Sequence, residues 1–373
     1  MRRALCSYAG GRKPARSGPG PVTEEDKAPK RRRDMPTALE HSPVVVAAPR
    51  LVRHPANPIL RPTQHWWENR WVYNAAAAVY RGRVHLLYRA QGVDWVSRLG
   101  LAVMSEDGVT VESRSPRPVF EPACDNPWER LGVEDPRLTR IGDVFYLCYT
   151  AASLYPAVKP PVSRRPTPFG DGVPWRTRIA IATTRDLRHF RRRAIAFRNW
   201  DNKNGALFPR KFEGRYLLLH RIFPDIHLGV SRDLHHWHNY GPILRVRPGM
   251  WDGNRIGIAG PPLPTPYGWL LIYHGVDEAR TYRLGVALLD LEDPRGVLGR
   301  CDEPILEPEE PYEREGLVPN VVFSCGAVYY RGQILVYYGA ADSVVCLATV
   351  PRERLWGWAR EVALRSRHDG QKR

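Results

Sequence analysis

The sequence lacks any apolar run of the roughly 20 residues that a membrane-spanning helix needs. Arg2 and Arg3 stand near its start, but no apolar segment of the kind found in secretory signals follows them. The six cysteines include no CxxC pair, so neither a disulfide framework nor a cysteine-based metal site is predicted. These absences predict a cytoplasmic protein without a membrane partner.

Acidic residues are too few to balance the basic ones, and the formal net charge is +17. Residues 1–34 hold ten Lys or Arg against four Asp or Glu, so part of the excess belongs to this terminal segment. No recognised nucleic-acid-binding module accompanies the charge, and the basic residues are scattered. We therefore expect no nucleic-acid partner, whereas an anionic small substrate would suit the charge.

Residues 1–45 have no hydrophobic periodicity and are rich in Arg, Lys, Pro, Gly and Ala. Such a composition cannot bury enough apolar surface to offset chain entropy, so we expect a disordered basic tail. Met35 lies within it and is an alternative start of translation. Residues 360–373 are polar and are expected to form a second loose tail, which leaves residues 46–359 as the folded catalytic domain.

What the sequence does contain is an internal repeat. Each copy has a short apolar strand, a polar turn often with Gly, a strongly hydrophobic strand with aromatic residues, and a further apolar strand. The copies begin near Ala75, Arg137, Gly205, Gly260 and Val321. A period of about 55–70 residues suits a four-stranded blade with long loops. The sequence therefore predicts an all-β fold, a five-bladed β-propeller, with a β-sandwich as the structural alternative.

Polar clusters stand where the loops before the innermost strands of a propeller would meet at one mouth of the channel. Turn formation alone explains any single cluster, because Asn, Asp, Gly and Pro interrupt strands anyway. Their recurrence favours a site, as do Arg89 and Arg221, which end strongly apolar strands and need polar or anionic partners there. The clusters include Asn74, Glu134-Asp135, Lys203-Asn204, Asp252 to Arg255, Asn320 and Asp342.

Seven sequence strings, in order, resemble glycoside hydrolase family 130, the β-mannoside phosphorylases and mannosidases built on five-bladed propellers. They are GVEDPR (132–137), ALFP (206–209) with LHR (219–221), GPP (260–262), LIYHG (271–275), LLDLEDP (288–294), VPNVVF (318–323) and YYGAAD (337–342). The resemblance extends from about residue 55 to residue 350.

This resemblance implies that Asp135, in the first string, is the single catalytic acid. An inverting hydrolase needs two carboxylates, one to protonate the leaving oxygen and one to activate water. An inverting phosphorylase needs only the acid, because phosphate is itself the nucleophile. The resemblance further implies that the proton passes through the mannose 3-hydroxyl, so that Asp135 acts by relay.

The phosphate-binding positions of the family's phosphorylases correspond to Lys203, Arg221 and Arg255, helped by Asn204 and Tyr282. Phosphate recognition requires cations in a fixed geometry, and all three positions are basic in this sequence. Hydrolases of the family carry acidic or aromatic residues there, so the sequence favours phosphorolysis. Lysine at position 203, where arginine is common, would bind phosphate as a point charge.

The resemblance assigns the mannose ring to Asn74, Arg89, Asp135 and Asp342, with His274 nearby. Ala75 stands where some family members carry Ser, so one hydroxyl contact is expected to be missing. The HHWH run at 235–238 is the one metal-like pattern. Nothing else in the sequence completes a ligand set, so no metal is predicted.

The sequence thus predicts an inverting glycoside phosphorylase. It would cleave β-mannosides with inorganic phosphate as co-substrate, without another cofactor, and give α-mannose 1-phosphate. Two alternatives are a β-mannosidase on the same fold and a carbohydrate-binding propeller without catalysis. The acceptor sugar, the linkage and the formation of a homo-oligomer are left open.

Overall fold

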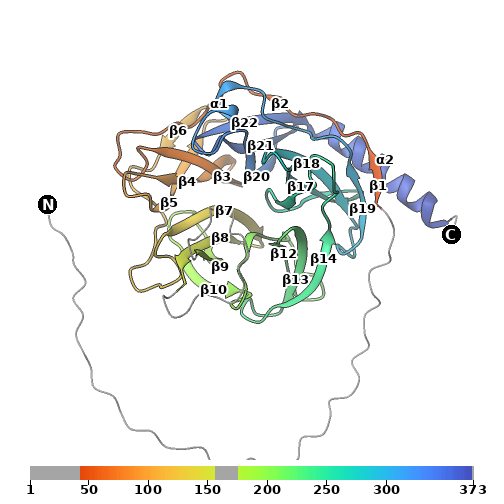
Figure 1. Ribbon diagram of the computed structural model, residues 1–373, viewed down its shortest axis with the longest axis horizontal. Helices are drawn as coiled ribbons and strands as arrows, with labels where there is room; N and C mark the ends of the chain where they lie inside the picture. Colours follow the sequence, from red (N-terminus) through yellow and green to blue (C-terminus); the bar gives the residue numbers. More distant parts are fainter. Residues whose placement is uncertain (1–42, 156–174, 372–373) are drawn as a thin grey trace, which may run out of the picture. The chain divides into compact units, whose positions relative to one another are not determined.

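The computed structural model describes residues 43–155 and 175–371, all of them within one compact unit, residues 38–373. Most of these residues form β-strands, which are arranged in four hydrogen-bonded sheets (Figure 1). The predicted all-β class is confirmed. The predicted tail at residues 1–45 lies outside the described residues as far as residue 42.

The largest sheet contains two antiparallel groups, joined through the parallel pair Ser97–Gly132. Gly132 has a φ of +136°, and a Cβ atom there would lie 2.7 Å from the backbone nitrogen of Ser97, so glycine is required at this junction. The strands are β3 (Trp71–Tyr80), β4 (Arg83–Gln91), β5 (Ser97–Met104), β6 (Val111–Arg114), β7 (Gly132–Ile141), β8 (Val144–Leu154), β9 (Trp175–Thr184) and β10 (Arg191–Ala196).

The other three sheets follow in sequence order, and the last two are completed by β1 and β2, the first two strands of the described segments. One holds β11 (Lys203–Leu207), β12 (Tyr216–Ile222), β13 (Asp225–Ser231) and β14 (His238–Leu244). The next holds β15 (Arg255–Ile258), β16 (Leu263–Thr265), β17 (Gly268–Val276), β18 (Tyr282–Leu289) and β19 (Val297–Cys301), with β1 (Val44–Val46) parallel to β19. The last holds β20 (Val322–Tyr330), β21 (Gln333–Ala340) and β22 (Val344–Pro351), with β2 (Val52–Arg53) antiparallel to β22.

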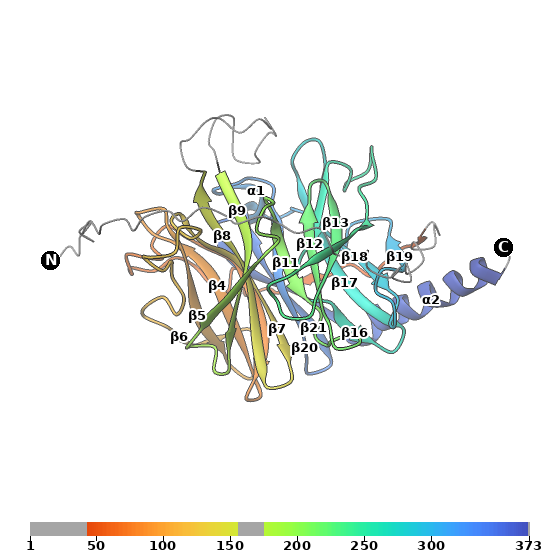
Figure 2. The ribbon, with the colours of Figure 1, turned by 90° about the horizontal axis from the view of Figure 1, so that it is seen from below.

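The strand groups lie around a common centre (Figure 1) and run between two rims of the unit (Figure 2). Near the centre the backbones approach closely, which explains the small residues there. A Cβ atom on Gly326 of β20 would lie 2.2 Å from the backbone nitrogen of Ala77 on β3. The alanine run Ala75–Ala78 therefore packs against β20 where larger side chains would not fit.

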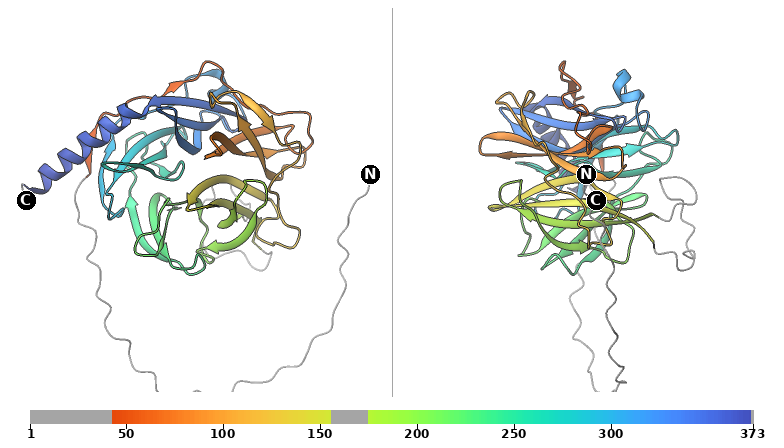
Figure 3. Two further views of the ribbon diagram at one scale, coloured as in Figure 1. Left: turned by 180° about the vertical axis from the view of Figure 1, so that it is seen from behind. Right: turned by 90° about the vertical axis from the view of Figure 1, so that its left-hand side faces the viewer.

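The C-terminal boundary of the domain differs from the predicted one. Residues 352–371 form helix α2 (Arg352–Gln371), which lies on the outer side of the strands beside β1 and β19 (Figure 3). The prediction of a loose polar tail at residues 360–373 is therefore wrong as far as residue 371. The signal was present in the sequence, because Leu355, Trp358, Ala359 and Val362 follow helical spacing, and all four side chains are buried. Neither α2 nor the short helix α1 (Pro311–Arg314), the helices of the described segments, has the length and apolarity needed to cross a bilayer.

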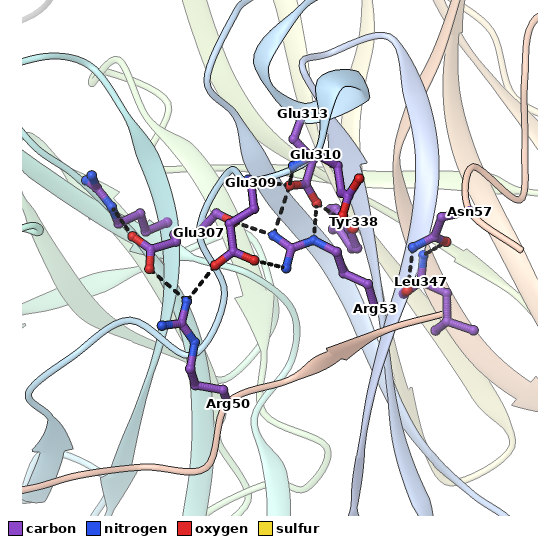
Figure 4. A network of polar contacts seen from close by, with 10 residues as sticks. Arg50, Arg53, Asn57, Glu307, Glu309, Glu310, Glu313, Tyr338 and Leu347 are labelled. Atoms are coloured by element: carbon purple, nitrogen blue, oxygen red, sulfur yellow. Dashed lines mark hydrogen bonds and ion pairs between the residues drawn. The ribbon is translucent and has the colours of Figure 1, made fainter. Parts of the chain in front are cut away.

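A buried carboxylate connects strand β2 to strand β21 of the last sheet (Figure 4). Glu313 of α1 has no exposed surface, and it accepts hydrogen bonds from Nε and Nη2 of Arg53, each at 2.9 Å. The hydroxyl of Tyr338 on β21 donates to the same carboxylate at 2.8 Å. Arg50 adds an exposed ion pair with Glu307 at 2.7 Å. Because the charge of Glu313 is paired and hydrogen-bonded, its burial is tolerated.

Candidate active site

Three inner strands carry the same local irregularity. Asn74, Asp135 and Asn204 adopt left-handed φ values of 48°, 48° and 57°. Each lies where the register between its strand and the partner strand shifts by a bulge. Asn and Asp tolerate this conformation better than most other residues, and a bulge re-aims the side chain next to it. The repeated bulge explains why amides and acids recur at these positions.

The carboxylate of Asp135 lies at the meeting point of these strands and is only 6% exposed. Its Oδ1 accepts hydrogen bonds from Nδ2 of Asn74 at 2.9 Å and from Nη1 of Arg89 at 3.0 Å. Burial alone would raise the pKa of Asp135, but the charges of Arg89 and Lys203 outweigh it and lower this pKa to about 2. In the free protein the carboxylate is therefore ionised at neutral pH.

Glu134 is a second acidic group of the site, and the sequence analysis gave it no role. Its Oε1 accepts a hydrogen bond from Nη2 of Arg89 at 2.9 Å, and its Oε2 lies 3.5 Å from Nζ of Lys203. In a regular strand Glu134 and Asp135 would point to opposite faces. The bulge removes that alternation, so Arg89 reaches both carboxylates. Glu134 thus joins Arg89, the arginine predicted to bind the sugar, to Lys203, the lysine predicted to bind phosphate.

Arg137 was also missed, although it belongs to the GVEDPR string. Its guanidinium is 1% exposed and donates from Nη1 to the carbonyl oxygen of Asp135 at 2.9 Å. It also donates to the side-chain oxygen of Asn204 at 3.2 Å and to the carbonyl oxygens of Ile258 and Ala259, each at 2.9 Å. Arg137 therefore fixes the second, third and fourth strand groups relative to one another around Asp135.

The predicted phosphate-binding cations lie close together and are named here the cation group: Lys203, Arg221 and Arg255. Lys203 and Arg221 are direct partners across β11 and β12. Nη2 of Arg255 donates to the hydroxyl of Tyr282 at 2.7 Å. Burial lowers the pKa of Arg221 to about 10, and the charge of Arg255 contributes in the same direction while Tyr282 opposes it. Burial likewise lowers the pKa of Lys203. A bound anion would relieve this repulsion.

His274 lies beneath the cation group and has no exposed surface. Its Nε2 is 3.5 Å from Nδ2 of Asn204, and its ring centroid is 4.5 Å from that of Phe323. Burial lowers the pKa of His274 well below its usual value, and Arg221 adds to the effect, so the ring is neutral. A Cβ atom on Gly257 would lie 2.5 Å from this ring, so glycine there makes room for it.

Asp342 approaches the same centre from the loop after β21, in a left-handed conformation with a φ of 51°. Burial raises the pKa of Asp342 to about 7; the charge of Arg89 opposes the shift and that of Asp135 adds to it. The two carboxylates therefore influence each other electrostatically. Nearby Gly339 is required, because a Cβ atom there would lie 2.2 Å from Oδ1 of Asn74.

The structure thus brings the predicted site residues into one cluster through hydrogen bonds, strand pairing, ring contacts and electrostatic interactions. They are Asn74, Arg89, Asp135, Lys203, Asn204, Arg221, Arg255, His274, Tyr282 and Asp342.

The histidine run gives no metal centre in the described segments, where no three His, Cys, Asp or Glu side chains gather suitably. Nδ1 of His236 instead lies 2.7 Å from Oδ2 of Asp233 within its own turn, as His189 does with Asp186.

Comparisons with known proteins agree with this geometry. The sequence profile of a family described as beta-1,4-mannooligosaccharide phosphorylase matches residues 50–361. A 1,2-beta-oligomannan phosphorylase from a Thermoanaerobacter species is 41% identical over 307 residues, which cover 80% of this chain and 96% of that protein. A beta-1,2-mannobiose phosphorylase from the same organism is 42% identical over 321 residues, covering 82% and 99%.

Solved structures show the same relationship. The beta-1,2-mannobiose phosphorylase of Listeria innocua, in complex with beta-1,2-mannobiose, superposes with a TM-score of 0.70 at 27% identity and covers 83% of this chain and 99% of that chain. A structure from work on GH130 hydrolases that target beta-1,2 mannosidic linkages in Candida mannan gives a TM-score of 0.72 at 26% identity, with 84% and 97% covered. The chain therefore belongs to glycoside hydrolase family 130.

Proposed function

We propose that this protein is a β-mannoside phosphorylase, which cleaves β-mannosides with inorganic phosphate and releases α-mannose 1-phosphate. The cation group beside a single hydrogen-bonded aspartate is the observation that carries the proposal. Lys203 is buried, Arg221 and Arg255 are half-buried, and the charge of Arg255 disfavours the charged form of Arg221, so an anionic ligand among them would be stabilising. Phosphate supplies several acceptor oxygens for the guanidinium groups of Arg221 and Arg255. The co-substrate therefore occupies the cation group.

Phosphorolysis is favoured over hydrolysis by what surrounds Asp135. A hydrolase that inverts would need a further carboxylate to activate water across the sugar from the acid. Of the neighbouring carboxylates, Glu134 is already paired with Arg89 and Lys203. Where a hydrolase would place its second carboxylate, this protein has the positive charges of the cation group. Phosphate attacks from that side, and the product has inverted configuration.

The low pKa of Asp135 fits this reaction when phosphate is considered. A general acid must carry a proton, and the charge of Lys203 is one cause of the low pKa in the free protein. Bound phosphate would offset the charge of Lys203 and so shift the pKa of Asp135 upward. Phosphate binding thus favours the protonated acid, which then protonates the leaving oxygen through a sugar hydroxyl.

The mannose ring lies between Asp135 and the side chains that surround it. Asn74 and Arg89 already donate hydrogen bonds to Asp135, and Asp342 completes the polar wall. We assign the β-1,2 linkage to the substrate. The two relatives named for β-1,2-mannosides are 41% and 42% identical, whereas a beta-1,4-mannooligosaccharide phosphorylase from Ruminococcus albus is 31% identical.

We further propose that the scaffold of the site is a five-bladed propeller. The largest sheet divides at the pair Ser97–Gly132, so with the other three sheets it yields five antiparallel groups. The inner strands contact one another in succession: β3 lies against β7 and β20, and β11 lies against β7 and β15. Strand β1 pairs with β19 of the fourth group, and β2 pairs with β22 of the fifth. Early and late segments of the chain are thereby joined, as closure of a ring would require.

One assay separates the candidate functions. The protein is incubated with β-1,2-mannobiose, β-1,4-mannobiose and mannosyl-glucose, with and without phosphate, and the products are followed by phosphorus NMR and chromatography. The proposal expects α-mannose 1-phosphate from the β-1,2 disaccharide only when phosphate is present. Free mannose at the same rate without phosphate would identify a β-mannosidase. Binding without turnover would identify a carbohydrate-binding propeller.

A further inference from the structure

Two tryptophans, the half-buried Trp71 and the exposed Trp95, form an aromatic pair near the site. The ring centroids of Trp71 and Trp95 are 4.5 Å apart, at an interplanar angle of 43°. Trp95 is 58% exposed, and its φ of 61° lies in the left-handed region. Bulky residues rarely adopt this conformation, which persists only where the surroundings impose it. The turn therefore holds an exposed indole in a fixed position.

The loop that presents Trp95 is built to hold one conformation. The backbone N–H of Trp95 donates to the carbonyl oxygen of Gly92 at 3.1 Å. Asp94 accepts a hydrogen bond from Nη2 of Arg98 at 2.8 Å, and the Arg98 guanidinium lies 4.6 Å from the ring centroid of Trp66. A Cβ atom on Gly92 would lie 1.8 Å from the carbonyl oxygen of Trp66. The aromatic surface is therefore preorganised.

A continuous line of contacts connects this loop to the catalytic aspartate. The carbonyl oxygen of Trp95 accepts a hydrogen bond from Nε2 of Gln91 at 2.9 Å. The hydroxyl of Tyr73 donates to Oε1 of Gln91 at 2.6 Å. The guanidinium of Arg89 lies 4.8 Å from the ring centroid of Tyr73 and donates to Asp135. The tryptophan pair is thus an extension of the site itself.

Strand register places the pair beyond the mannose ring. Trp71 opposes Gln91 and Tyr73 opposes Arg89, so these side chains share one face of the sheet. Trp71 precedes Asn74 by three residues on β3, which corresponds to about 10 Å along the strand. That distance exceeds what a single neighbouring sugar ring would fill.

The cation group lies on other strand groups, on β11, β12 and β15. In a displacement with inversion, the nucleophile and the leaving group occupy opposite sides of the reacting carbon. With phosphate on the cation group, the departing saccharide extends away from it, toward β3 and the loop between β4 and β5. Trp71 and Trp95 stand there.

We infer that Trp71 and Trp95 form a stacking platform for the second sugar ring of the departing saccharide, so that the enzyme prefers oligomannosides to the disaccharide. The inference rests on the proposed function, which fixes the direction of the leaving group. The C–H face of a pyranose is apolar and packs on an indole ring as other apolar groups do. The ligand class is a β-mannoside of three or more units.

The test compares phosphorolysis of β-1,2-mannobiose and β-1,2-mannotriose by the full chain and its Trp95→Ala variant. We expect the KM for the trisaccharide to rise about tenfold, the change that about 1.4 kcal/mol of lost binding free energy produces. The KM for the disaccharide and both kcat values should stay within about twofold. Trp95→Phe should retain most of the affinity for the trisaccharide, because a stacking ring is kept.

Trp200→Ala is the matched control. Trp200 is also exposed, at 47%, and is also stacked, 5.5 Å from the ring centroid of Phe197, but it belongs to another strand group. It should leave the KM for the trisaccharide within about twofold. Equal losses on both substrates in Trp95→Ala would overturn the inference, as would no loss on either. If Trp95→Ala is unstable to heat, Trp71→Ala provides the same comparison.

A binding measurement keeps the inference independent of turnover. Titration calorimetry without phosphate should show that the wild type binds the trisaccharide about tenfold more tightly than the disaccharide, and that Trp95→Ala removes the difference. If this holds although no mannose 1-phosphate forms, the platform stands and the proposed function fails. If the wild type binds both equally, or if Trp95→Ala only changes the oligomeric state, the platform is refuted.

Discussion

Lys203 and Arg221 are paired directly across β11 and β12, so two cationic side chains face the same side of one sheet. Like charges in this position destabilise a strand pair. Glu134 offsets the charge of Lys203 at 3.5 Å, and Tyr282 favours the charged form of Arg221. These two contacts reduce the repulsion between Lys203 and Arg221. An anion bound between the two cations would reduce it further.

Replacing Arg221 with alanine should raise the KM for phosphate by roughly 10- to 100-fold, because a charge-assisted hydrogen bond contributes about 1.5–3 kcal/mol. The KM for the mannoside should change much less. Steady-state kinetics with each substrate varied in turn measures both values. Arg245→Ala, at a largely exposed arginine, is the control and should behave as the wild type. An unchanged phosphate KM in Arg221→Ala would remove this residue from the phosphate site.

Phosphate should stabilise the protein in the absence of sugar, because a ligand that binds only the folded state adds about 2.7 kcal/mol at a concentration of 100 times Kd. Thermal unfolding followed by circular dichroism should show a Tm that rises with phosphate concentration. Arg255→Ala should reduce the rise, since its guanidinium belongs to the cation group. A wild-type Tm that does not respond to phosphate would contradict the assignment.

Replacing Asp135 with asparagine should lower kcat by at least about 1,000-fold, within the range that general acid catalysis contributes. The amide keeps the shape of the side chain, so the mannoside should still bind. Activity assays and titration calorimetry test the two statements separately. Substantial activity in Asp135→Asn would show that the proton comes from another group.

The contribution of Asp342 to the free energy of unfolding should fall as the pH rises. Its folded pKa of about 7 lies above the ordinary aspartate value of 3.8, so between these values the folded state binds more protons than the unfolded state. The contribution of Asp342 is therefore fully present below about pH 4 and is lost as the pH passes through 7. Urea unfolding at pH 5 and pH 8 should show a smaller loss in Asp342→Asn than in the wild type. Arg89, Lys203, Asp135 and Glu134 are unchanged in both proteins, so the difference reports on Asp342.

Replacing Glu313 with alanine should destabilise the fold by about 3–5 kcal/mol, because the partly buried Arg53 then keeps only the exposed Glu309 as a carboxylate partner and the hydroxyl of Tyr338 loses its acceptor. Urea unfolding measures the effect. Glu309→Ala is the matched control, since Glu309 also pairs with Arg53 but is 47% exposed, and it should cost less than about 1 kcal/mol. Specific activity of the folded fraction should not change in either variant.

The residues predicted for the site lie close together in the structure because the same polar residue types recur before successive inner strands. It could not predict the role of Glu134, because strand alternation places Glu134 and Asp135 on opposite faces until a bulge is known. The positive φ values of Asn74, Asp135 and Asn204 are compatible with their residue types, but the types alone do not require them. The sequence therefore predicted which residues come together, but it could not predict the bulges that orient them.

The ends of the domain were harder to predict than its centre. Helix α2 was overlooked because its polar residues outnumber the apolar stripe, although Leu355, Trp358 and Val362 have helical spacing. Strands β1 and β2 are short, and their partners lie more than 250 residues away in sequence, at Gly299 and Thr349. Such pairings depend on tertiary packing, which local patterns do not encode.

The pairing of β1 with β19 and of β2 with β22 has a consequence for biosynthesis. Val44 and Val52 leave the ribosome long before Gly299 and Thr349 exist, so the earliest strands wait for the latest ones. During that delay their backbone amides and apolar side chains are open to other chains. A nascent chain truncated before residue 299 would keep them exposed, and chaperone occupancy should therefore be greatest until the final strands emerge.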